Sequence, residues 1–600
     1  MDALEGAHRA TMVAYLKRSG GQEQYSEPLR ICGSSRVAPC LYAPWMKKTL
    51  FAGALALALA GLTSAQELVS AATEAAAGPR ITATKLKGHT RFLASDLLEG
   101  RGPATRGDEL AQAYIAAQFE SFGLEPGAAD GSYIQKVEIV GIKSAAPDTV
   151  VFKKGAEAVT LQKQEFVAFS GAEQPTSGFE NAELVFVGYG IEAPEFGWDD
   201  YKGLDVKGKV LVMMNNDPEN DPLLFKGKTR LYYGRWDYKY EMAASKGAAG
   251  AIIIHTVPSA GYGFSVVQNS WSGELFSLAG ETGPRVQVKM WATEEAVRKV
   301  ATLAGHDLAA LTAAAQKKDF KPVLLGVNLS MTLRNEVKKK ASANVIAKLT
   351  GSDPKLKAES VFFTSHHDHF GRIEAPAGQD GIFNGAHDNA VGVAGLLALA
   401  ESSAQLSERP KRTLYFAAVA AEEQGLLGSK YLAQNPPVPA GRIAANINMD
   451  GANIWGRTKD LTMIGYGKSS LDKTINALAA LQGRRVVADQ SPDKGFFYRS
   501  DQFSFAKKGV PAAYFDGGME VIGKPEGWGR KEQEAYEEKH YHQVSDELRD
   551  WWNLEGAIED FRLLFFLGVQ VANQAEMPAW NPGDEFEAAR KKAIAEAGAR

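Results

Sequence analysis

The stretch that decides the fold is Val361-Phe-Phe-Thr-Ser-His-His-Asp-His369. Its first half, residues 361–365, is a short apolar run that is typical of a buried strand. Its second half places three imidazoles around one carboxylate. In α/β sheets the chemistry gathers where strands end, so this stretch predicts a polar site at the carboxyl edge of a sheet.

Short apolar runs like this one recur on both sides of this stretch. Beyond the basic run at 338–340, short apolar runs alternate with segments of helical periodicity. The alternation predicts an α/β fold with a mixed, largely parallel sheet flanked by helices. The predicted strands are residues 344–349, 361–365, 413–420, 444–449 and 512–515, and the predicted helices are 390–404, 471–481 and 554–572.

Two segments with other sequence patterns precede this α/β region. Residues 81–123 have helical periodicity, whereas 140–333 consist mainly of short β-like runs separated by turn residues. We therefore predict a β-rich domain inserted into the main fold. The predicted ranges are an N-terminal helical part at 66–140, the insert at 141–335, the main catalytic domain at 336–577 and a tail at 578–600 that ends in a frayed surface helix.

The N-terminal residues predict export. Residues 46–65 combine a basic start, an apolar run and small residues before Gln66, which is the layout of a secretory signal peptide. The run is shorter than the roughly 20 residues of a membrane span, so a membrane anchor is the less favoured alternative. Residues 1–45 are interpreted as a non-native extension. The predicted location is the periplasm or the exterior, with no stable membrane span after cleavage.

Composition excludes several classes of function. Lys and Arg number 67 against 71 Asp and Glu, so no basic surface predicts nucleic acid as a partner. Both cysteines, Cys32 and Cys40, precede the predicted cleavage site. The mature protein would therefore have neither cysteine ligands nor a cysteine nucleophile. A serine hydrolase is also disfavoured, because no Gly-x-Ser-x-Gly turn precedes a helix in the α/β region.

Five polar clusters follow one another in the α/β region. Histidine and carboxylate side chains together form the open kind of zinc site that catalyses reactions. One such cluster is usually a solvated surface feature, but five in order at strand ends are specific. The ligand set also tolerates manganese or cobalt. The clusters are Ser365-His-His-Asp-His369, Gly385-Ala-His-Asp-Asn389, Ala421-Glu-Glu-Gln-Gly425, Asn448-Met-Asp-Gly451 and Tyr541-His-Gln-Val-Ser-Asp546.

These clusters resemble the pattern of the M28 family of zinc peptidases. The resemblance implies the zinc-peptidase, phosphorylase/hydrolase-like fold and two zinc ions as cofactors. It also implies that Asp388-Asn389 is a cis peptide. By motif, one zinc would be held by His366 and Asp450, the other by Glu423 and His542, and Asp388 would bridge them.

The same resemblance implies the catalytic roles. Glu422 would act as the general base on the attacking water and pass the proton to the leaving amine. Asp368 would orient His366 from behind. Tyr541 is a candidate donor to the oxyanion. Arg499 is a candidate for the wall of the substrate pocket, and His367, His369, His387 and His540 are expected to be loop or supporting residues.

The insert has a resemblance of its own. Val187-Gly-Tyr-Gly-Ile191, Trp198-Asp-Asp-Tyr-Lys-Gly203 and Lys246-Gly-Ala-Ala-Gly-Ala251 resemble a protease-associated (PA) domain. In the M28 family such an insert is expected to cover the active site or to select substrates.

The predicted function is a metallo-aminopeptidase that acts on peptides with a free N-terminus. A carboxypeptidase and a single-zinc glutaminyl cyclase on the same fold stay open as alternatives. A carboxypeptidase would need cationic side chains for a substrate carboxylate, and the sequence does not place Arg499 or Arg372. A non-catalytic, receptor-like relative is less favoured, because all five ligand positions are intact. The sequence does not predict the oligomeric state.

Overall fold

The computed structural model describes residues 68–221, 224–260, 263–271 and 273–598. The predicted extension (1–45) and signal peptide (46–65) lie outside the described residues. Within these described ranges, no helix is both long enough and apolar enough to cross a membrane.

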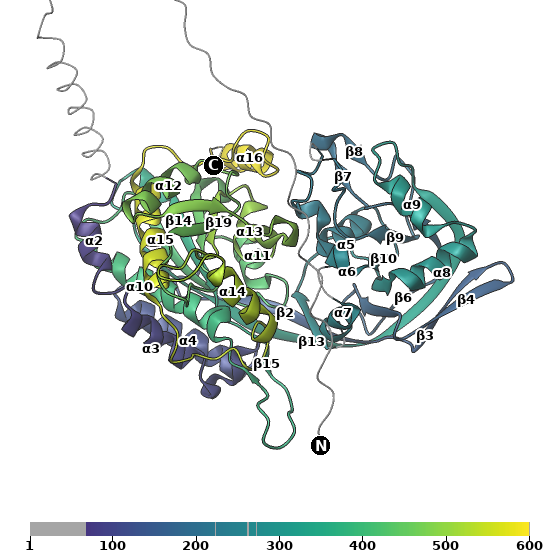
Figure 1. Ribbon diagram of the computed structural model, residues 1–600, viewed down its shortest axis with the longest axis horizontal. Coiled ribbons are helices and arrows are strands. Elements are labelled where there is room, and N and C mark those ends of the chain that lie inside the picture. The colour runs from purple at the N-terminus through teal and green to yellow at the C-terminus, as the bar shows by residue number, and fades with distance from the viewer. Residues whose placement is uncertain (1–67, 222–223, 261–262, 272, 599–600) are drawn as a thin grey trace, which may run out of the picture. The chain divides into compact units, whose positions relative to one another are not determined.

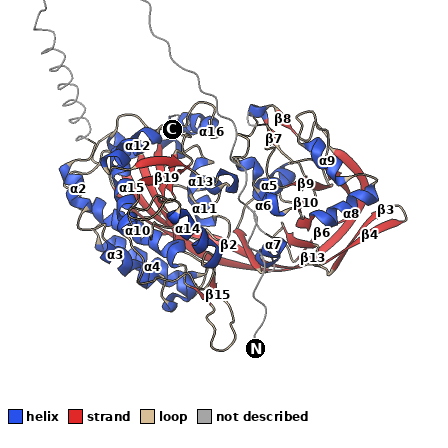
Figure 2. Ribbon diagram, viewed as in Figure 1, coloured by secondary structure: helices blue, strands red, loops and turns tan. Residues whose placement is uncertain are grey.

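The main sheet is mixed and largely parallel, as predicted (Figure 2). Four neighbouring strands run parallel in the order β17, β14, β18 and β21, and an antiparallel neighbour lies on each side. The strands in spatial order are β13 (Val323–Leu349), β17 (Thr413–Val419), β14 (Ser360–His366), β18 (Ile443–Asn448), β21 (Ala512–Phe515), β19 (Asp460–Ile464) and β20 (Arg485–Ala488), with the short β1 (Glu125–Pro126) also paired to β13.

Helices cover both faces of this sheet, which explains why the central strands β17, β14 and β18 are buried at every position. On β14, Phe363 packs into the core formed with α10 and α15, whereas its neighbour Phe362 packs on the other side against Phe505 of α13. The first face is covered by α10 (Val391–Ala404), α15 (Glu555–Asn573), α3 (Ala83–Leu93), α4 (Arg106–Ser121), α2 (Ala71–Ala77) and α12 (Leu471–Leu481), and the second by α11 (Leu427–Gln434) and α13 (Gln502–Ala506).

The insert has its own mixed sheet in the order β5, β12, β10, β9 and β6, with the last four strands parallel. Its strands are β3 (Thr149–Lys154), β4 (Glu157–Gln162), β5 (Phe166–Ser170), β6 (Thr176–Phe186), β9 (Val210–Met214), β10 (Gly250–His255), β11 (Glu274–Leu278) and β12 (Val288–Thr293). Its helices are α5 (Trp236–Ser245), α6 (Val257–Ala260), α7 (Phe264–Ser270), α8 (Glu294–Ala304) and α9 (Leu308–Ala315).

Two long strands run through both regions (Figure 1). β2 (Ile134–Ala145) pairs antiparallel with residues 334–345 of β13, and β13 also pairs with β6 of the insert and β17 of the main sheet. The predicted boundaries at 140/141 and 335/336 therefore fall inside strands. A continuous hydrogen-bonded ribbon, not a flexible linker, joins the insert to the main region.

The insert also contacts the main region through side chains. The Tyr232 ring lies 5.0 Å from the Phe503 ring, and Lys507 Nζ donates to the Tyr232 hydroxyl at 2.8 Å. The backbone N–H of Arg230 donates to the carbonyl of Pro492 at 3.0 Å. These contacts place residues 230–236 beside the carboxyl edge of the main sheet.

The last helix, which is expected to be a frayed surface segment, has a bond to the main sheet. α16 (Glu587–Gly598) buries Arg590, which is only 3% exposed. The Arg590 Nη1 atom donates to the carbonyl of Ile443 at 2.8 Å. A buried side-chain bond therefore ties this largely exposed helix to β18, and its fraying stays a prediction.

Candidate metal centre

The first group of donor atoms surrounds His366, the last residue of β14. Its Nε2 atom lies 3.1 Å from Asp388 Oδ1 and 3.2 Å from Asp450 Oδ1. Asp450 follows β18, and Asp388 belongs to the loop that leads into α10. Parallel strands bring these loops to one edge of the sheet, so the three side chains offer one imidazole and two carboxylates to a shared point.

The second group shares Asp388 with the first. His542 Nε2 lies 3.2 Å from Asp388 Oδ2 and 3.4 Å from Glu423 Oε2. The two oxygens of Asp388 therefore face different histidines, which is the arrangement of a carboxylate that bridges two cations. All five side chains predicted as ligands are brought together. The Asp388-Asn389 peptide is cis, as the resemblance implied.

His369 also joins the second group, which the sequence did not indicate. Its Nδ1 atom lies 2.6 Å from Glu423 Oε1, and it forms a possible ligand set with Glu423 and Asp388. Burial lowers the pKa of His369 to about 4, so the ring is neutral at physiological pH. A neutral imidazole here can serve either as a ligand or as a support for Glu423.

The electrostatics of the cluster favour a cation. Burial raises the pKa of Glu422 and Glu423 well above the usual range; repulsion by Glu423 adds to the shift of Glu422, and repulsion by Asp388 adds to the shift of Glu423. For Asp388 burial acts in the same direction, but hydrogen bonds from His366 and His542 outweigh it and hold its pKa well below the usual value. Divalent cations would offset the repulsion and keep all these carboxylates ionised.

Asp368 positions two parts of the centre. Its carboxylate accepts the backbone N–H groups of Glu422 at 3.0 Å and Glu423 at 3.4 Å. The His366 Nδ1 atom lies 3.3 Å from the carbonyl of Asp368 and 3.9 Å from its carboxylate. Asp368 therefore holds the Glu-Glu turn with its side chain and the imidazole mainly with its backbone.

Ser500 is a supporting residue whose contact the sequence did not identify. Its hydroxyl donates to Asp450 Oδ2 at 2.5 Å, and Asn448 Nδ2 donates to Ser500 Oγ at 2.8 Å. Asn448 also donates to Gln502 Oε1 at 2.9 Å. Gln502 is thus part of the hydrogen-bonded chain that fixes Asp450.

Arg101 holds the ligand loops from behind. Its side chain is 1% exposed and donates to the carbonyls of His367 (2.8 Å), Asn384 (2.7 Å) and Gly385 (3.0 Å), and also to that of Leu93. Burial lowers its pKa to about 10, so it stays charged at neutral pH. The only sequence signal was the turn-forming run 99–103, which says nothing about these distant partners.

The remaining histidines of the clusters are engaged elsewhere. His367 Nε2 lies 2.9 Å from Asp108 Oδ1, and His387 Nε2 lies 2.9 Å from the carbonyl of Ala452. His540 Nδ1 lies 2.9 Å from Ser545 Oγ. These three are supporting residues, as predicted. Arg372 is exposed and pairs with Glu99 at 3.1 Å, so it does not reach the centre.

Asp546 fixes the loop that carries the bridging carboxylate. It accepts the backbone N–H of His387 at 2.9 Å, that of Asp388 at 3.0 Å, and the Tyr536 hydroxyl at 2.6 Å.

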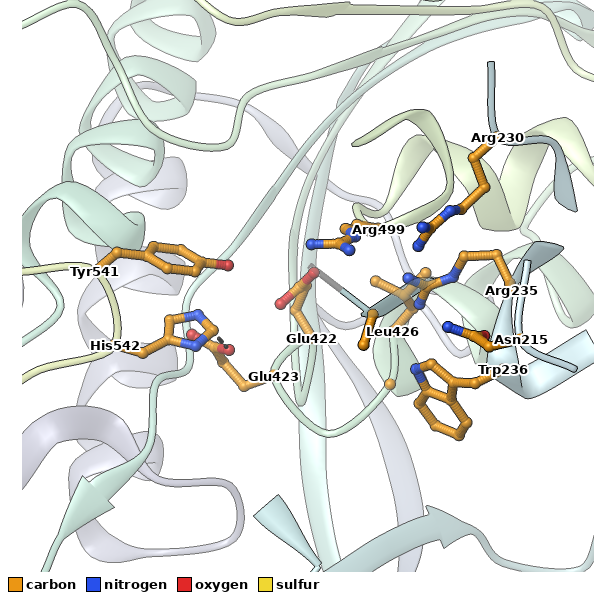
Figure 3. A pocket seen from close by; sticks show the side chains of 12 residues that line it. Asn215, Arg230, Arg235, Trp236, Glu422, Glu423, Leu426, Arg499, Tyr541 and His542 are labelled. Carbon is orange, nitrogen blue, oxygen red and sulfur yellow. Dashed lines mark ion pairs between the residues drawn. The ribbon is translucent and has the colours of Figure 1, made fainter. Parts of the chain in front are cut away.

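Two cavities open beside the centre. The smaller, about 270 Å³, is lined by Glu422, Glu423 and His542 on the side of the main sheet, and by insert residues on the other side. Figure 3 shows Tyr541, His542 and Glu423 at one side, Arg230 and Arg235 at the opposite side, and Glu422 with Arg499 between them. The larger, about 1090 Å³, is lined by Asp388, Glu422, Asp450 and many other residues. Substrate would therefore meet both the donor atoms and the insert.

A mixed α/β sheet with two histidine–carboxylate groups at its carboxyl edge defines a zinc-hydrolase class of domain. Residues 344–561 match the sequence model of Peptidase family M28. This segment is therefore similar to the peptidases of family M28.

Similar proteins agree with this class. Two proteins described as probable zinc metalloproteases from Pyrenophora teres f. teres are 36% identical over 108 residues and 41% identical over 107 residues. Each match covers 18% of this chain, and the chain spans about a fifth of the length of these curated relatives (21% and 22%).

Two solved structures are also similar to parts of this chain. The aminopeptidase from Aneurinibacillus sp. strain AM-1 is 24% identical, with 84% of this chain and 97% of that chain covered and a TM-score of 0.46. The peptidase M28 precursor from Shewanella amazonensis SB2B is 16% identical, with 87% and 98% covered and a TM-score of 0.38.

Proposed function

We propose that this protein is a two-zinc exopeptidase that removes residues from the N-terminus of peptides. The observation that carries the proposal is the position of Asp388, whose two oxygens face His366 and His542 separately. The donor set of imidazoles and carboxylates fits zinc. Zinc bound there would acidify the attacking water and polarise the scissile carbonyl.

Each residue then has a defined role. His366 and Asp450 would hold one cation, Glu423 and His542 would hold the other, and Asp388 would contact both. His369, at 2.6 Å from Glu423, fixes the orientation of that carboxylate and is the alternative ligand. Both His369 and His542 approach the Glu423 carboxylate. The His542 side chain is 34% exposed, so it can also contact substrate.

Glu422 is the proposed general base. Its carboxylate lines both cavities, and its raised pKa, caused chiefly by burial and the neighbouring Glu423, suits a group that takes up a proton and gives it back. It takes the proton of the attacking water and delivers it to the leaving amine. Tyr541 also lines both cavities and is placed to donate to the developing oxyanion.

The larger cavity supports recognition of a free N-terminus. Besides the centre, its wall contains six carboxyl groups, those of Asp493, Asp516, Glu534, Glu537, Glu538 and Asp560, against three cationic side chains, Arg230, Lys494 and Arg499. A wall with this excess of carboxyl groups attracts the ammonium group of a peptide. This feature favours an aminopeptidase over a carboxypeptidase, although Arg230 and Arg499, which line both cavities, are the kind of residue that a carboxypeptidase needs.

The test uses free and N-acetylated peptides with the zinc-loaded protein. Glu422→Gln is expected to lower kcat by about 10²-fold or more while two zinc equivalents stay bound, since only the base is lost. Glu408→Gln, on an exposed position, is the matched control. Full turnover in Glu422→Gln would refute the base, and equal cleavage of acetylated peptides would refute the aminopeptidase assignment.

We further propose that the protein is exported through residues 46–65 and that residues 141–335 are a PA domain. N-terminal sequencing of protein recovered outside the cytoplasm should begin at Gln66. Protein recovered only from the cytoplasm with an uncut N-terminus would contradict the export proposal.

A further inference from the structure

We infer that Arg230, Arg235 and Arg499 form a binding site for a carboxylate of the peptide substrate. The inference rests on the proposed peptidase function and names the class of substrate: peptides that carry a carboxylate close to the cleaved bond. Arg230 and Arg235 belong to the insert, so the insert would select substrates while the main region performs the chemistry.

The three guanidinium groups line the same small cavity as the proposed base. The cavity of about 270 Å³ is lined by Arg230, Arg235 and Arg499 together with Glu422 and His542. Figure 3 shows Arg499 beside Glu422 and the other two arginines next to it, on the side away from His542. A substrate that reaches the centre through this cavity must therefore pass the three cations.

Contacts with the protein fix where these side chains lie. The Nη2 atom of Arg230 donates to the carbonyl of Ser259 at 2.9 Å. Arg235 Nε lies 3.5 Å from Asp237 Oδ1, and its side chain is 14% exposed. The Arg499 guanidinium lies 5.8 Å from the centre of the Phe496 ring. Side chains held in this way lose little further freedom when they bind a ligand.

The charge in this cavity suits an anion. Arginine stays protonated at any physiological pH, and its planar guanidinium binds carboxylates through two parallel hydrogen bonds. Glu423 belongs to the proposed metal centre, so its charge would be taken up by the cations held there. Asp237, beside Arg235, and Glu422, in the same cavity, offset part of the charge of the three guanidinium groups, and a bound carboxylate would offset the rest.

Two parts of a peptide could supply this carboxylate. One is the C-terminal carboxylate of a short peptide, and the other is an aspartate or glutamate side chain next to the cleaved bond. The chemistry of recognition is the same for both, so the experiment compares two substrate pairs. The first pair is Ala-Ala with its C-terminal amide, and the second is a longer amidated peptide with Glu or Gln at the second position.

The test measures kcat/KM for both pairs in the zinc-loaded full chain. The wild-type protein is expected to prefer the carboxylate member of at least one pair, and Arg235→Gln and Arg230→Gln are each expected to reduce that preference about tenfold or more. Arg235→Lys should restore part of it, because it keeps the charge without the planar fork. Arg298→Gln, on the exposed helix α8 of the insert, is the matched control.

Each outcome has one meaning. Loss of preference only in the dipeptide pair assigns the site to the C-terminal carboxylate, and loss only in the Glu/Gln pair assigns it to an acidic side chain. No preference in the wild-type protein, or an equal fall on both members of each pair in the variants, overturns the inference while leaving the peptidase function intact. If zinc-loaded wild-type protein hydrolyses none of the peptides, the proposed function itself is wrong, and this inference falls with it.

Discussion

Replacing Arg101 by methionine should destabilise the protein strongly. The variant keeps the volume of the side chain but removes the donors to four buried backbone carbonyls, at residues 93, 367, 384 and 385. A charge-assisted hydrogen bond contributes about 1.5–3 kcal/mol, but bonds of one network do not add. Removing one partner of a buried charged network costs about 3–5 kcal/mol, and this is the loss of unfolding free energy that we expect.

Urea denaturation of metal-free and zinc-loaded protein measures this loss. The midpoint should fall without a change in the dependence on urea concentration, because the surface exposed on unfolding is the same. The substitution should lower the unfolding free energy of the zinc-loaded protein more than that of the metal-free form. The reason is that Arg101 holds the segments at His367 and Gly385, which adjoin His366 and Asp388. The unfolding free energy of Arg101→Lys should lie between those of the wild-type protein and Arg101→Met, because lysine keeps the charge but offers fewer donors.

A surface arginine supplies the control for this prediction. Arg91→Gln, on the exposed side of α3, should change the unfolding free energy by no more than about 0.5 kcal/mol. A loss below about 1 kcal/mol in Arg101→Met, with normal zinc uptake, would refute the reasoning that this side chain fixes the ligand loops.

Two further predictions follow from buried polar contacts. Ser500→Ala removes the donor to Asp450 and should weaken zinc binding about 10–100-fold in a chelator competition, with activity restored by excess zinc; unchanged affinity would contradict the role of Ser500. Lys239→Met removes a buried amine near Asp200 and Asp217; burial raises the pKa of both carboxyl groups to about 7 and lowers that of Lys239 to about 7. Carboxyl groups with raised pKa values are neutral in the folded protein at pH 5, and their contribution to the unfolding free energy is lost as the pH rises through 7. The variant should therefore lose about 3–5 kcal/mol of unfolding free energy at pH 8 and measurably less at pH 5. Equal losses at both pH values would contradict the prediction.

The sequence by itself determined the main sheet and the five proposed ligands. Strand β21 and helix α12 begin and end at the predicted residues. The reason is local: a strand covered on both faces must be apolar throughout, and a polar cluster directly after it can only lie at the edge of the sheet. The resemblance to the M28 family then assigned residues 366, 388, 423, 450 and 542 as ligands, one motif at a time.

Only the tertiary structure decided how the centre is supported and what surrounds it. Arg101 reaches carbonyls more than 260 residues away, and a backbone carbonyl leaves no trace in the composition of either segment. His369 was indistinguishable from its neighbours by spacing, yet its ring meets Glu423. The arginines of the insert line the same cavity as Glu422 because β2 and β13 pair in one register and join the two regions. Pairing between strands that lie far apart in the sequence is set by packing and not by the local sequence pattern.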